Sequence, residues 1–155
     1  MKYKFNYQTS NIDLWKLSMY GTYGSMVGVS NIIFTVAMVL LAGKFWSDAN
    51  SFMKILLIIA ISLFTVIQPI AVYIRAKRQV ATVPQDMEFS LDDKGIHIKT
   101  SNKNSDLKWS TIKGVTKKPS MIIIFTTKKH GFIISNKMLG KEKEDFYNYV
   151  VSKIK

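Results

Sequence analysis

The residues that could take part in catalysis or bind a metal are few and far apart. The chain has 155 residues, only two histidines, His97 and His130, and no cysteine. A thiolate zinc site, a cysteine nucleophile and a disulfide framework are therefore excluded. Neither histidine has a carboxylate pair beside it in the sequence at the spacing of metal ligands. We predict no metal site and no catalysis by histidine.

The acidic residues and glycines give no catalytic motif either. Asp92 and Asp93 stand directly before Lys94 and Gly95, a pattern typical of a turn rather than of two catalytic carboxylates. The glycines are isolated or lie within an apolar stretch, so the chain has no phosphate-binding glycine loop. We therefore expect a protein that is not an enzyme, with no catalytic residue, no cofactor and no small-molecule substrate.

Lysine is the remaining chemically distinctive residue. The net charge is +12, and 17 of the 22 Lys and Arg residues lie in residues 75–155. Two lysine pairs fall in predicted loops that we expect at one end of a sheet, where they would contact anionic lipid or a partner: Lys117 with Lys118, and Lys128 with Lys129. Solvated loop lysines are the simpler alternative. Nucleic-acid binding is not expected, because aromatic residues are not interleaved with the basic ones.

Two long apolar stretches dominate the first half of the chain. No residue is charged from 17 to 43 or from 55 to 74. About 20 helical residues cross a hydrocarbon core of roughly 30 Å, so we predict membrane spans at about 20–43 and 54–74. A buried core helix or a cleaved signal peptide fits less well, because both runs are long and neither has a polar face.

The short connection from Lys44 to Lys54 makes the two spans an antiparallel hairpin, within an N-terminal part covering residues 1–80. Basic residues cluster outside the hairpin rather than in its turn: Lys2, Lys4, Lys16, Arg75, Lys77 and Arg78. The positive-inside rule then predicts a plasma-membrane protein with both termini in the cytosol. Neither span contains an ionisable side chain of the kind that ion and proton transporters use, so transport is not expected.

Two further features of the predicted spans concern packing. Small residues recur at helical spacing, which favours close contact with the second span or with a second copy: Gly21, Gly24, Ser25 and Gly28. The dipeptide Gln68-Pro69 predicts a kink, because proline lacks the N–H of a helical hydrogen bond. We interpret it as a passive kink rather than a gate.

From residue 86 to 155 the pattern changes to short alternating segments, typical of a separate β domain. Residues 87–91 and 96–100 flank a turn and predict a hairpin. A further strand is expected at 107–112, where Trp109 and Ile112 would anchor the core with a bulge or bend between them. Later strands are expected at 121–127 and 132–135, followed by a C-terminal helix.

An antiparallel meander closed by one helix is the plan of a pleckstrin-homology-like fold, although we count five or six strands where a complete version has about seven. The chain is thus expected to be an α+β membrane protein. It also resembles the YcxB-like family of bacterial membrane proteins, and the residues that carry the resemblance are Phe89, Asp93–Ile96, Trp109–Ile112, the strand ending near Lys137, and Phe146. The resemblance implies this architecture and no activity.

The function expected from these features is that of an interaction module. The cytosolic domain would bind a protein partner or the anionic inner leaflet. The two spans would lie in the lipid bilayer. This hypothesis expects residues 86–155 to fold without the hairpin. The alternatives are a self-protection (immunity) protein against a pore-forming toxin or peptide, and an accessory subunit of a membrane transport complex. Homo-oligomer formation also stays open.

Overall fold

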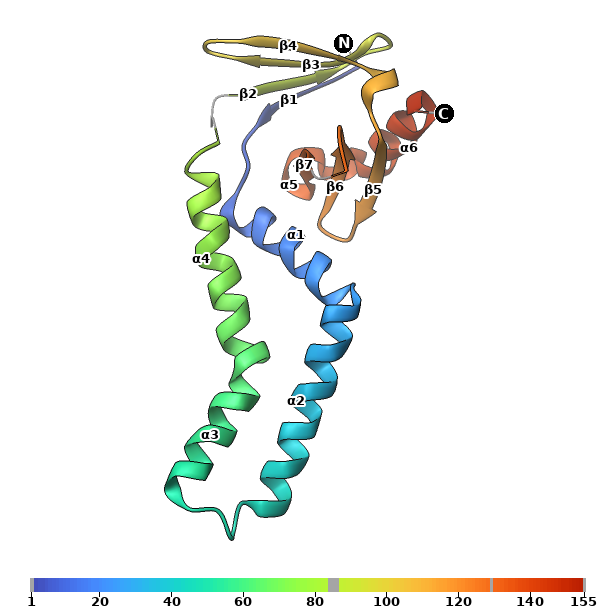
Figure 1. Ribbon diagram of the computed structural model, residues 1–155. Coiled ribbons are helices and arrows are strands. Elements are labelled where there is room, and N and C mark those ends of the chain that lie inside the picture. Colours follow the sequence, from blue (N-terminus) through green and yellow to red (C-terminus); the bar gives the residue numbers. More distant parts are fainter. Residues whose placement is uncertain (1, 84–86, 129, 155) are drawn as a thin grey trace. The chain divides into compact units, whose positions relative to one another are not determined.

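The computed structural model describes residues 2–83, 87–128 and 130–154 (Figure 1). The chain forms two compact units. The β unit contains the residues up to Asp13 and those from Val80 onward, and the helical unit contains Leu14–Gln79. The helical unit is therefore an insertion between two segments of the β unit. The predicted domain start at residue 86 lies outside the described residues.

The helical unit is built from four α-helices and one π-helical segment. They are α1 (Asn11–Tyr23), α2 (Met26–Phe45), α3 (Ser51–Ser62), the π-helix Leu63–Ile67, and α4 (Gln68–Val80). The 20 residues of α2 and the 30 continuous helical residues from Ser51 to Val80 are long and apolar enough to cross a membrane. The two predicted apolar helices are thus present, joined by a short turn.

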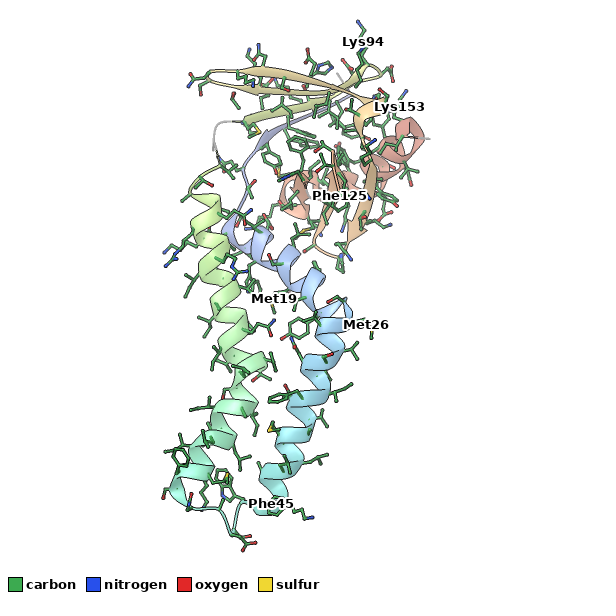
Figure 2. The ribbon with its side chains drawn as sticks, in the orientation of Figure 1. Met19, Met26, Phe45, Lys94, Phe125 and Lys153 are labelled. Carbon is green, nitrogen blue, oxygen red and sulfur yellow. The ribbon has the colours of Figure 1, made fainter. Side chains whose placement is uncertain are left out.

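The apolar side chains of these long helices mostly face outward rather than one another. Ile33 and Leu40 of α2 and Ile58 of α3 each expose more than half of their surface. Figure 2 shows side chains projecting away from the helix pair, with Met26 and Phe45 marking the two ends of α2. Contiguous apolar surface of this extent is rare on a protein surrounded by water.

The first long helix begins later than predicted. The sequence pattern placed its start near residue 20, but α1 ends at Tyr23 and α2 begins at Met26. A Cβ atom on Gly28 would lie 2.5 Å from the Cα atom of Tyr23. Gly28 therefore permits the tight turn between α1 and α2, and the predicted packing of the small residues against the second span or a second copy stays a prediction.

Within its described residues, the β unit has seven strands in two antiparallel sheets. The first sheet has the order β1-β2-β3-β4 and the second has the order β5-β6-β7. The strands are β1 (Tyr3–Tyr7), β2 (Met87–Leu91), β3 (Gly95–Thr100), β4 (Asn104–Lys108), β5 (Gly114–Lys118), β6 (Met121–Phe125) and β7 (Gly131–Ser135). Two helices follow, α5 (Asn136–Leu139) and α6 (Lys143–Ile154), with short 3-10 turns at Trp109–Thr111 and Gly140–Glu142.

Most of the predicted β elements are confirmed, with shifted bounds. The hairpin at 87–100 is β2 and β3, the strands expected at 121–127 and 132–135 are β6 and β7, and the C-terminal helix is α6. The strand expected at 107–112 instead ends at Lys108. The expected bend follows as a 3-10 turn that lets both Trp109 and Ile112 reach the core, with 9% and 5% of their surface exposed.

Strand β1 was not predicted, because we assigned residues 1–80 as a whole to the N-terminal part that contains the hairpin. Its Tyr7 is opposite Met87 and its Tyr3 is opposite Leu91, so β1 pairs along the whole of β2. Alternate residues of β1 point inward, where Tyr3 and Phe5 place their ring centroids 5.2 and 5.8 Å from that of Phe146. The β unit therefore needs a strand from each side of the helical insertion.

A single hydrophobic core lies between the two sheets and α6. Its fully buried centre includes Phe89, Ile96, Ile122 and Phe146, all with no exposed surface. Alternation along β2 and β3 brings one side of each strand inward, and α6 adds Phe146 and Val150 from one helical face. This packing fixes the surfaces described next.

Candidate functional site

The lysines singled out from the sequence do not come together. Lys118 is opposite Met121 at one end of β6, whereas Phe125 is opposite Gly131 at the other end. Lys128 lies in the turn at that second end, and Lys129 lies outside the described residues. The expected placement of both loops at one end of the sheet was wrong, because successive hairpins of a meander turn at alternate ends (Figure 1).

Lys117 lies on β5 and faces α6. Its Nζ atom is 2.8 Å from Oε2 of Glu144 and 5.1 Å from the ring centroid of Tyr147. Nearby, Lys143 of α6 donates to the main-chain oxygens of Lys118 and Pro119, each at 2.8 Å. These contacts fasten the end of β5 to the start of α6, and they make Lys117 part of a contact between two elements rather than an isolated loop cation.

An apolar groove lies farther along the same two elements. It has a volume of about 260 Å³ and is lined by Val115 of β5 and by Tyr147, Val151 and Ile154 of α6. The three α6 residues follow the helical spacing that places side chains on one face. All four are partly exposed. The groove runs beside β5, which is the last strand of its sheet and is bonded at its Lys118 end by Lys143 of α6.

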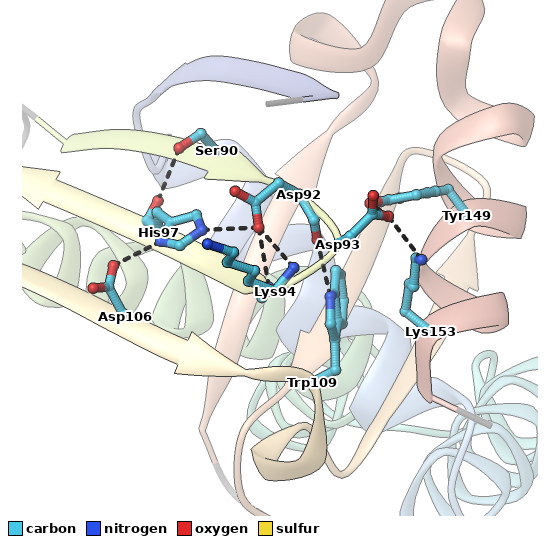
Figure 3. A network of polar contacts seen from close by, with 10 residues as sticks. Ser90, Asp92, Asp93, Lys94, His97, Asp106, Trp109, Tyr149 and Lys153 are labelled. Carbon is cyan, nitrogen blue, oxygen red and sulfur yellow. Dashed lines mark hydrogen bonds and ion pairs between the residues drawn. The ribbon is translucent and has the colours of Figure 1, made fainter.

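A polar network surrounds His97 on β3 (Figure 3). The Nδ1 atom of His97 is 2.7 Å from Oδ1 of Asp106, and its buried Nε2 atom is 3.0 Å from Oδ1 of Asp92. Strand register explains the grouping, since His97 is opposite Asp106 on β4 and Ser90 on β2. The hydrogen bond with Asp106, followed by the close contact with the Asp92 carboxylate, raises the pKa of His97.

Asp92 also organises the turn between β2 and β3. Its Oδ1 atom accepts hydrogen bonds from the main-chain N–H of Lys94 at 2.8 Å and of Gly95 at 3.2 Å. Its main-chain oxygen accepts the indole N–H of Trp109 at 3.0 Å. The contact with His97 and then the bond from Lys94 lower the pKa of Asp92 to about 2. Asp92 thus makes the turn hydrogen bonds that the sequence predicts, and it also contacts His97.

Asp93 connects the same turn to α6. Its Oδ1 atom is 2.8 Å from Nζ of Lys153 and accepts the hydroxyl of Tyr149 at 3.3 Å. Burial, and then the charge of Asp93, raises the pKa of Tyr149 to about 12. Residues 92–109 and the last turns of α6 are thus tied together by Asp92 and Asp93, and this network stabilises the fold.

The network does not form a metal centre. Among residues 2–83, 87–128 and 130–154, no group of three or more His, Asp and Glu side chains is arranged to hold a metal ion. The two carboxylates near His97 lie on different ring nitrogens, so the three side chains do not converge on one point. The sequence did not predict carboxylates beside His97. The proximity of these carboxylates to His97 follows only from the register in which β2, β3 and β4 pair.

We expect His97 to make the β unit most stable in mildly acidic solution. A histidine whose pKa is raised on folding stabilises the fold fully below its unfolded pKa of about 6.5, and the contribution disappears as pH rises through the folded pKa. The lowered pKa of Asp92 affects stability in strongly acidic solution. Its contribution to folding is lost as pH falls from 3.8 toward about 2.

Thermal unfolding of wild type and His97→Gln, measured by circular dichroism, should therefore differ most between about pH 4 and pH 6.5 and should converge at alkaline pH. His130→Gln serves as the control, since His130 lies exposed in the turn after β6. A difference between wild type and His97→Gln that stays constant from acidic to alkaline pH would contradict the role of the two carboxylates.

Polar groups within the helical unit are paired with one another. The side-chain amide of Asn31 donates to Oε1 of Gln68 at 3.0 Å, and Trp15 donates its indole N–H to the main-chain oxygen of Pro69 at 3.0 Å. Asn31 exposes only 6% of its surface. The dipeptide Gln68-Pro69 predicted as a kink thus stands at the end of a π-helical segment, and both of its residues accept hydrogen bonds from other helices.

The π-helix also explains a hydrogen bond from Tyr23 to the main-chain oxygen of Phe64. The N–H of Gln68 donates to the oxygen of Leu63 rather than to that of Phe64. The next residue, Pro69, has no N–H to offer. The freed oxygen of Phe64 accepts the hydroxyl of Tyr23 at 2.7 Å. A neighbouring helix therefore supplies the donor that proline removes.

Comparison with known proteins identifies the β unit. Neither the curated proteins nor the solved structures contain a match to this chain. The family model of YcxB-like proteins matches residues 91–149. This stretch runs from the end of β2 into α6, and includes the His97 network together with Val115 and Tyr147 of the groove. The resemblance expected from the sequence is confirmed over these residues, which carry a YcxB-like domain within the β unit.

Proposed function

We propose that this protein is a non-enzymatic, two-span membrane protein that holds a cytosolic interaction domain at the plasma membrane. The outward-facing apolar surfaces of α2 and of the helix from Ser51 to Val80 support the spans, because apolar side chains favour a hydrocarbon surrounding. The pairing of polar groups inside the helical unit supports them further, because a bilayer core offers no water to satisfy such groups.

The pairing of β1 with β2 supports a single location for both ends of the hairpin. Tyr7 precedes the helices and Met87 follows them, and the two residues are opposite each other in one sheet. A hairpin that crosses a membrane twice must begin and end on the same side. The six flanking Lys and Arg residues, against Lys44 and Lys54 in the turn, favour the cytosolic side.

We further propose that the β unit is pleckstrin-homology-like. The strand count supports this assignment, since β1 and β5 bring the five strands whose ranges were predicted to seven in the described residues, in sheets of four and three. The helix α6 follows the last strand and packs against β5, as the closing helix of such a fold would. An architecture of this kind provides a stable frame whose edges and helix face are available for binding.

The observation that carries the interaction function is the open apolar groove between β5 and α6. Partly exposed apolar side chains that line an open groove are a surface that a partner can cover. A protein partner fits it better than lipid headgroups do, because the lining is apolar and the adjacent Lys117 is paired with Glu144.

Crosslinking of the full-length protein in native membranes, followed by affinity capture and mass spectrometry, tests this function. The comparison is with Phe146→Asp, which places a charge where wild type has no exposed surface and should unfold the β unit while leaving the helices intact. A partner captured by wild type and lost with the variant is the expected result. Equal capture by both proteins would assign recognition to the hairpin and overturn the interaction function of the β unit.

A further inference from the structure

Two arginines near the end of α4 point to a binding site for a lipid headgroup. We propose that Arg75 and Arg78 together bind the phosphate of an anionic phospholipid, whose acyl chains lie against Ile70 and Ile74. The inference concerns the helical unit alone and goes beyond the proposed interaction domain. It rests on the proposed membrane spans, because a phospholipid meets this part of α4 only in a bilayer.

The first argument is the type of the basic residues. Of the 22 Lys and Arg residues in the chain, 20 are lysine, and the two arginines are Arg75 and Arg78. Lysine would serve equally well for the positive charge of a cytosolic flank or at the negative end of a helix. Arginine differs, because its planar guanidinium donates two parallel hydrogen bonds to one phosphate. The choice of arginine at these two positions therefore indicates phosphate recognition.

The second argument is the position of the two side chains. Residues three apart on a helix are neighbours, with Cβ atoms about 5–6 Å apart, so both guanidinium groups can reach one phosphate. The inward side of these turns is occupied by Ala76 and Val80, which expose 3% and 7% of their surface. Arg75 and Arg78 are exposed, and in the described part of the chain neither forms an ion pair. Both are available to an external anion.

The third argument is the apolar surface that precedes the arginines. Ile70 and Ile74 expose 54% and 47% of their surface. Together with Arg78 they follow the four-residue spacing that places side chains on one side of a helix. This side of α4 therefore changes from apolar to cationic within one turn, as a phospholipid changes from acyl chain to phosphate. A free phosphate ion would leave both isoleucines uncovered, so the pattern favours a lipid.

The fourth argument is net charge, which selects among phospholipids. Lys77 is also exposed, so the last turns of α4 carry three cations. Residues 14–79 contain a single acidic residue, Asp48, which lies in the turn at the other end of the hairpin. A zwitterionic headgroup brings a cation of its own, which these three cations would repel. Phosphatidylglycerol brings none, so the site favours an anionic headgroup of this kind.

The test uses the full-length protein in detergent micelles with equimolar phosphatidylglycerol and phosphatidylcholine, and native mass spectrometry counts the lipids that it retains. We expect roughly fivefold preference for phosphatidylglycerol, and loss of this preference in the double variant Arg75→Gln/Arg78→Gln. The control, Lys44→Gln/Lys54→Gln, removes the same charge beside the turn between α2 and α3 (Figure 1) and should keep the preference. Circular dichroism checks that the helices of each variant are intact.

A second double variant, Arg75→Lys/Arg78→Lys, keeps both charges and removes the planar forks. We expect its preference for phosphatidylglycerol to fall roughly threefold. Retention equal to that of wild type would show that charge alone attracts the lipid, and the inference would be wrong. Displacement of the lipid by an equal concentration of glycerol 3-phosphate, which has no acyl chain, would also overturn it.

Failure of this site and failure of the proposed spans give different results. A wild-type protein that retains both lipids equally, with its helices intact, contradicts the lipid site and leaves the spans as proposed. A protein that stays monodisperse after the detergent is removed contradicts the spans, and the lipid site fails with them.

Discussion

Deleting residues 2–8 is expected to unfold the β unit, although the deleted segment lies before the helical insertion. The deletion removes β1, whose inward residues Tyr3, Phe5 and Tyr7 pack in the core, and Tyr7 exposes only 5% of its surface. The Tyr7 hydroxyl also accepts the main-chain N–H of Ile133 at 3.1 Å. Without β1, one edge of β2 and the rings of Phe89 and Phe146 would meet solvent.

The size of the effect follows from these contacts. Each large apolar side chain that loses full burial costs about 1.5–3 kcal/mol, and β1 shields several. The sum approaches the roughly 5–15 kcal/mol that holds a small domain together. Limited proteolysis should cut the β unit of the truncated protein rapidly at lysines that are protected in wild type. Replacing Lys4 and Asn6 together with alanine, at the exposed positions of the same strand, is the matched control.

A second variant keeps β1 and replaces residues 8–86 with a two-residue turn that joins Tyr7 to Met87. We expect its β unit to fold, because these two residues are already opposite each other. This variant lacks the helical unit and should still unfold cooperatively, whereas residues 87–155 alone should not. This revises the expectation from sequence that residues 86–155 fold without the hairpin. Cooperative unfolding of residues 87–155 alone would show that β1 is dispensable.

Cysteine labelling should give a nearly complete contrast between the hairpin turn and the β unit. The chain has no cysteine, so Ser47→Cys in the exposed turn before α3 and Ser101→Cys in the exposed turn before β4 each carry one thiol. In intact cells a membrane-impermeant maleimide should label Ser47→Cys and leave Ser101→Cys at background. After lysis both should react.

The two serines are matched in residue type and exposure, so reactivity reports their location. Labelling of Ser101→Cys in intact cells would place the β unit outside and contradict the proposed orientation. Protection of both positions until lysis would show that the turn does not reach the outer surface, and the spans would then be excluded. The quantity measured is the fraction of protein labelled before and after lysis.

The elements that sequence predicts best here are those with local signals. The apolar helices are long, the hairpin of β2 and β3 has its turn residues at Asp92 and Gly95, and α6 follows a helical period. The bend at Trp109 follows from the spacing of two core residues. By contrast, β1 has only five alternating residues, and its partner is 80 positions away, from Tyr7 to Met87. No local pattern announces such a pairing.

The candidate site shows the same limit. The groove needs Val115 of β5 beside Tyr147 of α6, and the His97 network needs the register of three strands. Residue types alone place none of these side chains together. The error over the lysine loops was avoidable, since a meander sends consecutive turns to opposite ends. The start of α2 was missed because an uncharged run does not reveal the tight turn beside Gly28.

The separation of β1 from β2 has a consequence for how the protein is made. Ribosomes add about 5–20 residues per second. The 80 positions between Tyr7 and Met87 therefore impose a wait of roughly 4–16 s. During that interval β1 has no partner strand, and its three aromatic side chains have no core to enter. In the proposed membrane protein, insertion of the hairpin would therefore come before the β unit can fold.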